Sequence, residues 1–300
     1  MRKNRHKRGN FWECEAMKTD EWKCYHRAVI PRTPPHVVPD LRPIEDGSIW
    51  KIWRRGRPLL ARWITDFDCG YETNWWYVIK DTPFDIDALK AKRRYEITKG
   101  LKNFDVRIID PRAYKEELYR VQVAAVSAWP SKYRPLTDQE RFTNGIDAWG
   151  RYAVFGAFWK ETKELAGYAL LSSDGEGVIN FQTMMTVPSL EKYSVNAALV
   201  WKVVTQCTEF LSAGGILCDG ARSIRHETAF QDYLEKYFGF RKAYCHLHVR
   251  YHPKIKWLIR FLFPLRKALL ALDGIGVVHS VNGVLKMEEI CRGDAAEGNR

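Results

Sequence analysis

The sequence predicts an α/β (α+β) fold, in which a mixed, mostly antiparallel sheet is flanked by helices. The first observation is the stretch 180–251, where three strand-like apolar runs alternate with two amphipathic segments. The second is the order of patterns from residue 104 to 187: strand, two helices and three strands. The third is the composition of the 300 residues, which are 46% hydrophobic and 13% aromatic and so exclude a disordered chain.

Each element is predicted from a local pattern. Residues 104–109 alternate between apolar and polar and form a half-buried strand, and residues 113–129 show helical apolar spacing closed by Pro130. Thr137 and Glu140 have the spacing of a helix-starting capping box. The remaining elements follow in order: strands at 152–159, 165–172 and 178–187, a helix at 194–213, a strand at 215–220, a second helix closing on Gly239-Phe240, and a strand at 246–251.

Composition changes along the chain predict four segments. Residues 1–49, with five prolines, are expected to be an extended or partly disordered arm, and residues 50–102 an aromatic, basic region with a helix opening at Thr82-Pro83. Residues 103–252 form the α/β domain. Residues 253–300 carry a basic amphipathic helix over 254–272, with an apolar stripe at 258, 262, 265, 269 and 272, followed by a frayed tail.

Charge and cysteine content limit the partners and the compartment. The net charge of +12 favours anionic partners such as nucleic acid, a phosphorylated cofactor or an acidic membrane. Seven scattered cysteines show no CxxC pair and no zinc spacing, so we expect reduced thiols, no metal and a cytoplasmic protein, with membrane association left open. The basic start is not followed by an apolar run, so no secretory signal or transmembrane helix is expected.

The element order of residues 104–251, together with Gly239-Phe240-Arg241 after the last helix, resembles the GNAT superfamily of acyl-CoA-dependent N-acyltransferases. The layout is also similar to the FemAB-like branch, whose members transfer acyl or aminoacyl groups to amines of cell-envelope precursors. The resemblance implies an acyltransferase acting on an amine or hydroxyl of a small-molecule, sugar or peptide precursor. It implies acyl-CoA or another acyl donor, with charged tRNA as a candidate.

The same resemblance implies a donor site beside a splayed or bulged strand at 178–187. Its residues would be Thr186, Val187, Ser194, Val195 and Asn196, because the free N–H groups at the helix start favour a pyrophosphate. The glycine-rich loop of the family is missing, since residues 188–196 contain no glycine and include an acid, Glu191. This departure leaves room for an aminoacyl-tRNA.

A polar cluster follows the strand at 215–220, where open α/β sheets bind ligands. Asp219 or His226 is a candidate base for deprotonating an amine, and Arg222 or Arg225 a candidate for holding an anionic substrate. The general acid of the family is a tyrosine four residues before Gly-Phe, and Tyr233 is the candidate here although Glu235 occupies that position. Each of these residues has a structural alternative, as helix cap, surface group or core side chain.

Two other functions remain open. One is a non-catalytic nucleic-acid-binding protein that uses the basic and aromatic N-terminal hundred residues to stack bases. The other is a peripheral contact with an anionic membrane through residues 254–272, against the alternative that this helix docks on the core.

Overall fold

The computed structural model describes residues 21–25, 27–52, 57–131, 134–173, 175–224, 229–274 and 276–297. Their contacts divide the chain into two compact units. Among the described residues, unit 1 comprises 79–220 and 230–241, and unit 2 comprises 21–78, 221–224, 229 and 242–297. The chain passes between the units within strands β4 (Trp75–Lys80), β9 (Ile216–Ala221) and β10 (Arg241–Tyr251), and at the start of helix α8 (Ala229–Phe238).

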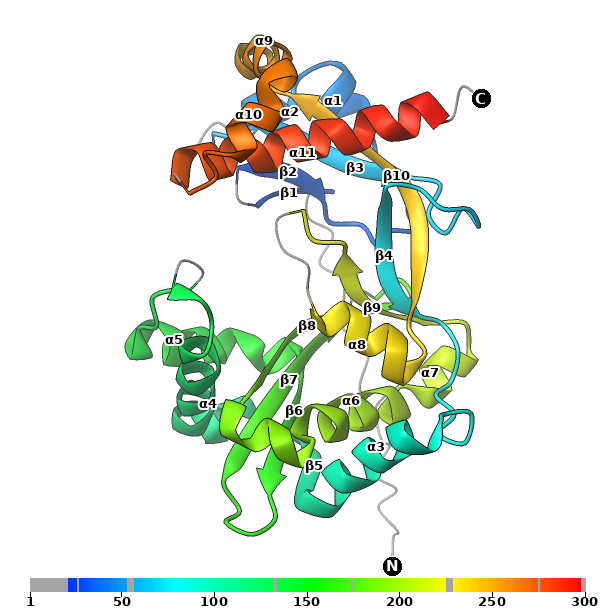
Figure 1. Ribbon diagram of the computed structural model, residues 1–300, viewed down its shortest axis with the longest axis vertical. Coiled ribbons are helices and arrows are strands. Elements are labelled where there is room, and N and C mark those ends of the chain that lie inside the picture. The colour runs from blue at the N-terminus through cyan, green and yellow to red at the C-terminus, as the bar shows by residue number, and fades with distance from the viewer. Residues whose placement is uncertain are drawn as a thin grey trace, which may run out of the picture. The chain divides into compact units, whose positions relative to one another are not determined.

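Unit 1 has the mixed α/β architecture that the sequence predicts (Figure 1). Its other elements are α3 (Ala91–Asn103), β5 (Phe104–Ile109), η1 (Pro111–Tyr114), α4 (Lys115–Ser127), α5 (Gln139–Ile146), η3 (Asp147–Arg151), β6 (Ala153–Trp159), β7 (Leu165–Ser173), β8 (Val178–Thr186), η4 (Pro188–Tyr193), α6 (Val195–Gln206), α7 (Thr208–Ser212) and α8 (Ala229–Phe238). The strand order is β9-β8-β7-β6-β5, antiparallel except for the parallel pair β8 and β9. The order of elements over residues 104–251 is the predicted one.

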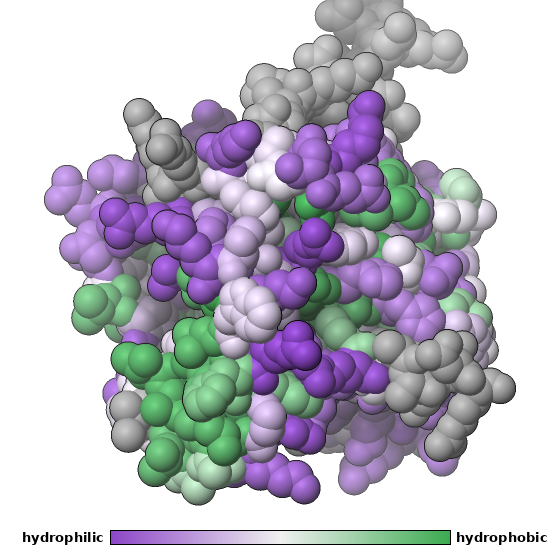
Figure 2. All heavy atoms as spheres, turned by 90° about the horizontal axis from the view of Figure 1, so that it is seen from above, coloured by the Kyte–Doolittle hydropathy of each residue, from purple (hydrophilic) through white to green (hydrophobic). Residues whose placement is uncertain are grey.

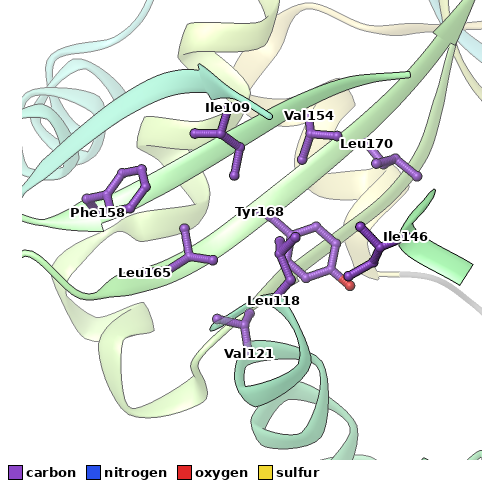
Figure 3. Packing of buried hydrophobic residues seen from close by; sticks show 9 residues of the cluster. All are labelled: Ile109, Leu118, Val121, Ile146, Val154, Phe158, Leu165, Tyr168 and Leu170. Atoms are coloured by element: carbon purple, nitrogen blue, oxygen red, sulfur yellow. The ribbon is translucent and has the colours of Figure 1, made fainter. Parts of the chain in front are cut away.

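Helices cover both faces of this sheet because successive side chains of a strand point to opposite sides. On β7, Tyr168 and Leu170 pack with Leu118 and Val121 of α4 in one buried cluster (Figure 3). The buried Tyr168 hydroxyl donates a hydrogen bond to Gln122 Oε1 at 2.7 Å, so its polar atom is satisfied. On the other face, a Cβ at Gly167 would lie 3.1 Å from Leu199 of α6.

Two predicted helices of unit 1 have different bounds. The helix expected from Thr82 begins only at Ala91, because the Asp85 carboxylate accepts the N–H of Asp87 and holds a turn instead. The helix expected at 194–213 divides at Cys207 into α6 and α7. Thr205 donates its hydroxyl to the carbonyl of Trp201 at 2.8 Å, a bond that bends helices.

Unit 2 combines a small sheet with the N-terminal and C-terminal segments. Its other elements are β1 (Trp22–Tyr25), β2 (Ala28–Pro31), α1 (Arg42–Glu45), α2 (Ile49–Ile52), β3 (Leu60–Thr65), α9 (Pro253–Leu262), η5 (Phe263–Leu265), α10 (Arg266–Leu270) and α11 (Gly276–Glu297). The strand order is β1-β2-β3-β10, with β2 and β3 parallel and the other pairs antiparallel.

The expectation of an extended arm is wrong for residues 21–49, while residues 1–20 lie outside the described part. Trp22, Val29, Ile44 and Ile49 are buried together with Ala61 of β3. Strands and helices of four residues are too short to produce a periodic pattern, so the prolines dominated the sequence signal.

The expectation of a frayed tail is also wrong for most of residues 273–300, since α11 runs from Gly276 to Glu297. Met287 and Ile290 of this helix are buried against Leu60, Trp75 and Leu247. Because the apolar side of α11 packs against these residues, the helix is stable although it contains glycines.

Candidate active site

Strand β8 separates from β9 part-way along its length. The parallel pairing covers only Val178–Asn180 against Ile216–Cys218, although β8 continues to Thr186. On its other side β8 contains a bulge, because Leu170 pairs with Thr183 and Leu171 with Phe181, which leaves Gln182 extra. The predicted splay and bulge are therefore both present. Beyond Asn180, the backbone of β8 does not pair with β9 and can pair with a peptide-like ligand.

Asp219 lies on β9, beyond the last residue that pairs with β8. Burial raises the pKa of its carboxyl from 3.8 to about 7, and a hydrogen bond with Gln231 of α8 offsets part of that rise. A carboxylate that titrates near pH 7 exchanges protons efficiently at physiological pH. The carboxyl of Asp219 can therefore take up or release a proton near neutral pH.

Tyr233 lies in an aromatic cluster on α8. Its ring stacks on Phe230 at a centroid distance of 6.2 Å and contacts Tyr237 at 4.9 Å, while Phe230 contacts Phe181 of β8 at 5.8 Å. Burial raises the pKa of the Tyr233 hydroxyl, with further contributions from Tyr237 and the charge of Glu96. Tyr233 therefore keeps its proton at physiological pH.

Gln231 and Tyr233 both lie on α8, two positions apart. Because Gln231 is the hydrogen-bond partner of Asp219, this helix connects the two predicted residues Asp219 and Tyr233.

The five predicted donor-site residues come together where η4 meets α6. The Thr186 hydroxyl donates to Asn196 Oδ1 at 2.9 Å, and the Val187 N–H donates to the carbonyl of Ala166 at 2.8 Å. Val195 is fully buried. Ser194 is also buried, and it takes the left-handed backbone conformation with φ of 68°. The Thr186 hydroxyl and the Val187 N–H are thus already hydrogen-bonded within the protein.

The start of α6 faces an acid. The Ser194 hydroxyl donates to Glu96 Oε2 of α3 at 2.6 Å, across 98 positions of sequence. Gly100 permits this approach, since a Cβ there would lie 2.5 Å from the Ser194 carbonyl oxygen. The carboxylate of a second acid, Glu191, lies 3.4 Å from the Thr186 hydroxyl oxygen. A diphosphate placed at this helix start would meet two negative charges.

Arg222 belongs to unit 2 and is engaged there. Its guanidinium donates to the carbonyl of Asn74 at 2.8 Å and lies 4.2 Å from the ring centre of Trp76. We assign it a packing contact in place of the predicted substrate contact. The other two residues predicted beside it, Arg225 and His226, lie outside the described residues.

Two residues that contact these groups, Glu96 and Gln231, escaped the sequence analysis, and so did the buried Lys80. Lys80 is buried at the end of β4, and burial lowers the pKa of its ammonium, partly opposed by Asp81. In the sequence, Lys80 is distinguished only as a charged residue at the end of an apolar strand. Glu96 and Gln231 look like ordinary surface residues of helices, so no local pattern distinguishes them.

No group of three or more potential metal ligands occurs within the described ranges. The cysteines of that part of the chain form no disulfide bond with one another; they are Cys24, Cys69, Cys207, Cys218, Cys245 and Cys291.

Comparisons with known proteins found similarity at the level of fold. No model of a protein family and no curated protein matches the sequence. Among solved structures, L-PGS from Bacillus licheniformis aligns with a TM-score of 0.49 and 11% identity, over 80% of this chain and 83% of its own. FemX aligns with a TM-score of 0.46 and 11% identity, over 77% and 85%. A GCN5-related N-acetyltransferase from Kribbella flavida aligns with a TM-score of 0.41 and 10% identity, over 75% and 81%.

Proposed function

We propose that the protein is an acyltransferase, which moves an acyl or aminoacyl group from an activated ester or thioester to an amine or hydroxyl. The observation that carries this proposal is Asp219, a carboxyl with a pKa of about 7 on the strand that diverges from β8. An adjacent helix supplies Tyr233, a tyrosine that stays protonated. A base, an acid and an unpaired strand edge are the parts that acyl transfer requires.

Each part has a role in the reaction. Backbone groups of β8 beyond Asn180 bind polar groups of the donor's acyl or aminoacyl part, which holds the reactive carbonyl near the end of β9. Asp219 takes a proton from the attacking amine as its nitrogen bonds to the carbonyl carbon. The bond from that carbon to the leaving sulfur or oxygen then breaks, and Tyr233 protonates the leaving atom. Solvent returns a proton to Tyr233 and removes one from Asp219.

The acidic helix start favours a donor that places no diphosphate on α6. Glu96 and Glu191 oppose coenzyme A there, while the net charge of +12 favours a large polyanion elsewhere on the protein. We infer that an aminoacyl-tRNA is the donor class that fits best, with acyl-CoA as the competing class. We propose a cytoplasmic location, because cysteines that form no disulfide bond with one another suit a reducing compartment.

Nucleic-acid binding through the aromatic N-terminal region has no specific support. Trp75, one of the tryptophans on which that function depended, is only 2% exposed and packs in the core of unit 2. Trp63 is stacked on His248 at a centroid distance of 5.4 Å, so the protein itself covers one of its faces.

A donor panel tests the proposal. Purified protein is incubated with acyl-CoAs and charged tRNAs, and donor binding and transfer to simple amines are measured for wild type and Tyr233→Phe. We expect transfer from aminoacyl-tRNA, reduced about 100-fold or more in Tyr233→Phe. Tyr95→Phe, at an exposed tyrosine, is the matched control. Absence of transfer from every donor refutes the acyltransferase proposal.

The charge at α6 is tested separately by Glu96→Gln, which keeps a partner for the Ser194 hydroxyl but removes the negative charge. We expect coenzyme A to bind the variant roughly fivefold or more tightly than wild type. Glu116→Gln, at an exposed position of α4, should leave the affinity unchanged. Tight binding of coenzyme A to wild type, with no gain in the variant, would overturn the inference about the donor while leaving acyl transfer intact.

A further inference from the structure

Segment 253–272 of unit 2 presents apolar side chains on two sides. Ile259 faces inward and is 5% exposed, which shows that α9 is docked through this side. Trp257 is 73% exposed and Phe261 71%, and Leu258 and Leu265 are also exposed. These four positions are spaced as one face of a helix.

The outward surface differs from the stripe expected from the sequence. Leu258, Leu265 and Leu272 of that stripe are exposed, whereas Leu262 and Leu269 are half-buried. Figure 2 looks onto this end of the molecule and shows apolar residues gathered in one patch beside polar ones. We call the outward set the α9–α10 face; it consists of Trp257, Leu258, Phe261, Leu265, Leu270 and Leu272.

The α9–α10 face is hollowed and preformed. Trp257, Arg260, Phe261, Pro264 and Leu265 line a shallow groove of about 480 Å³. The segment is held in place beneath it. The His252 side chain accepts the N–H of Lys254 at the start of α9, and Arg266 pairs with Glu289 of α11 at 3.2 Å. Because this surface is already ordered, a partner can bind without a folding cost.

The charged side chains of the segment itself are all basic. Residues 253–272 contain five basic side chains and no acidic ones. Lys254, Lys256, Arg260 and Lys267 are exposed. Basic residues interleaved with exposed Trp, Phe and Leu are the composition of helices that lie in the interface of anionic bilayers.

We propose that the α9–α10 face docks on an anionic membrane surface, with Trp257 and Phe261 inserted at the level of the lipid headgroups. A second copy of this chain fits less well, because a two-fold contact would bring the same basic residues together. A nucleic acid fits less well because exposed leucines gain nothing from a phosphate backbone. No helix within the described ranges is long and apolar enough to cross a bilayer, so the contact proposed is peripheral.

The experiment is flotation of the full chain with vesicles of neutral phosphatidylcholine alone or with added phosphatidylglycerol. We expect binding that increases with anionic lipid and weakens with salt. Trp257→Ala/Phe261→Ala should lower the partition coefficient about tenfold or more. Trp129→Ala/Leu136→Ala, at exposed apolar positions of unit 1, is the matched control and should bind like wild type.

A charge variant separates the electrostatic contribution. Lys254→Gln/Lys256→Gln should lose affinity for anionic vesicles only, whereas Lys90→Gln/Lys92→Gln, exposed in unit 1, should lose little. Circular dichroism checks that each variant is folded.

Three results would overturn the proposal. One is that wild type fails to float with anionic vesicles. Another is that Trp257→Ala/Phe261→Ala floats like wild type. The last is that sedimentation shows a dimer which this variant dissociates, which would assign the face to a second copy. None of these measurements depends on acyl transfer, so the membrane proposal and the proposed function fail separately.

Discussion

Replacing Asp219 by Asn should make the protein more stable while making it less active. The isosteric amide can still bond Gln231, but it carries no charge into the half-buried site. When a catalytic carboxylate is charged in a half-buried position, its charge serves the reaction but lowers the stability of the fold. The prediction therefore distinguishes a functional carboxyl from one that only stabilises the fold.

The magnitude follows from the pKa of Asp219. The folded value of about 7 lies above the ordinary 3.8, so between these values the folded state holds a proton that the unfolded state has released. Protonated Asp219 makes its full contribution to the free energy of unfolding below pH 3.8, and this contribution is lost as the pH rises through 7. At 1.36 kcal/mol for each pKa unit the ceiling is about 4 kcal/mol, and partial exposure reduces it to about 2 kcal/mol.

Urea denaturation at two pH values measures this effect. At pH 8, Asp219→Asn should unfold with a free energy about 2 kcal/mol higher than wild type, and at pH 5 the gain should fall to less than half of that. Asp232→Asn, at an exposed position of α8, is the control and should change little at either pH. The wild-type rate of transfer should rise with an apparent pKa near 7 as Asp219 deprotonates, and Asp219→Asn should lose about 100-fold or more.

The reasoning is refuted if the variant is less stable than wild type at pH 8, or if the difference is the same at both pH values. Either result would mean that the charged carboxylate is stabilised in the fold, with a pKa near the ordinary one.

Two further substitutions test the packing that positions these groups. Gly100→Ala places a Cβ 2.5 Å from the Ser194 carbonyl oxygen, so α3 must shift away from α6. We expect urea denaturation to show a free energy of unfolding about 2 kcal/mol lower than that of wild type. Gly145→Ala, with open space around it, is the control and should be neutral or stabilising. Ile290→Ala in α11 should lower the free energy of unfolding by about 2–4 kcal/mol, because Ile290 is buried. For Val277→Ala, at the exposed start of the helix, this free energy should change by no more than about 0.5 kcal/mol. Equal effects of the two substitutions would show that α11 is not part of the core.

The sequence by itself determined the order of elements in residues 104–251 and the strand that carries the bulge. Alternating and helical periodicities, with Pro130, Pro188 and Gly239 as boundaries, are local properties that any reader of the chain can find. The same local signals brought Asp219 and Tyr233 forward as candidates, because a strand end and the last helix of the unit can be located without coordinates.

Tertiary structure decided what depends on contacts between distant segments. Glu96 reaches Ser194 across 98 positions, and burial raises the pKa of Asp219, although neither effect leaves a trace in the neighbouring residues. Only packing decided that Ile259 faces the protein while Trp257 and Phe261 face outward, since both sides of that helix are apolar in sequence. Periodicity reports which residues share a face, but the surface against which that face is buried belongs to the whole fold.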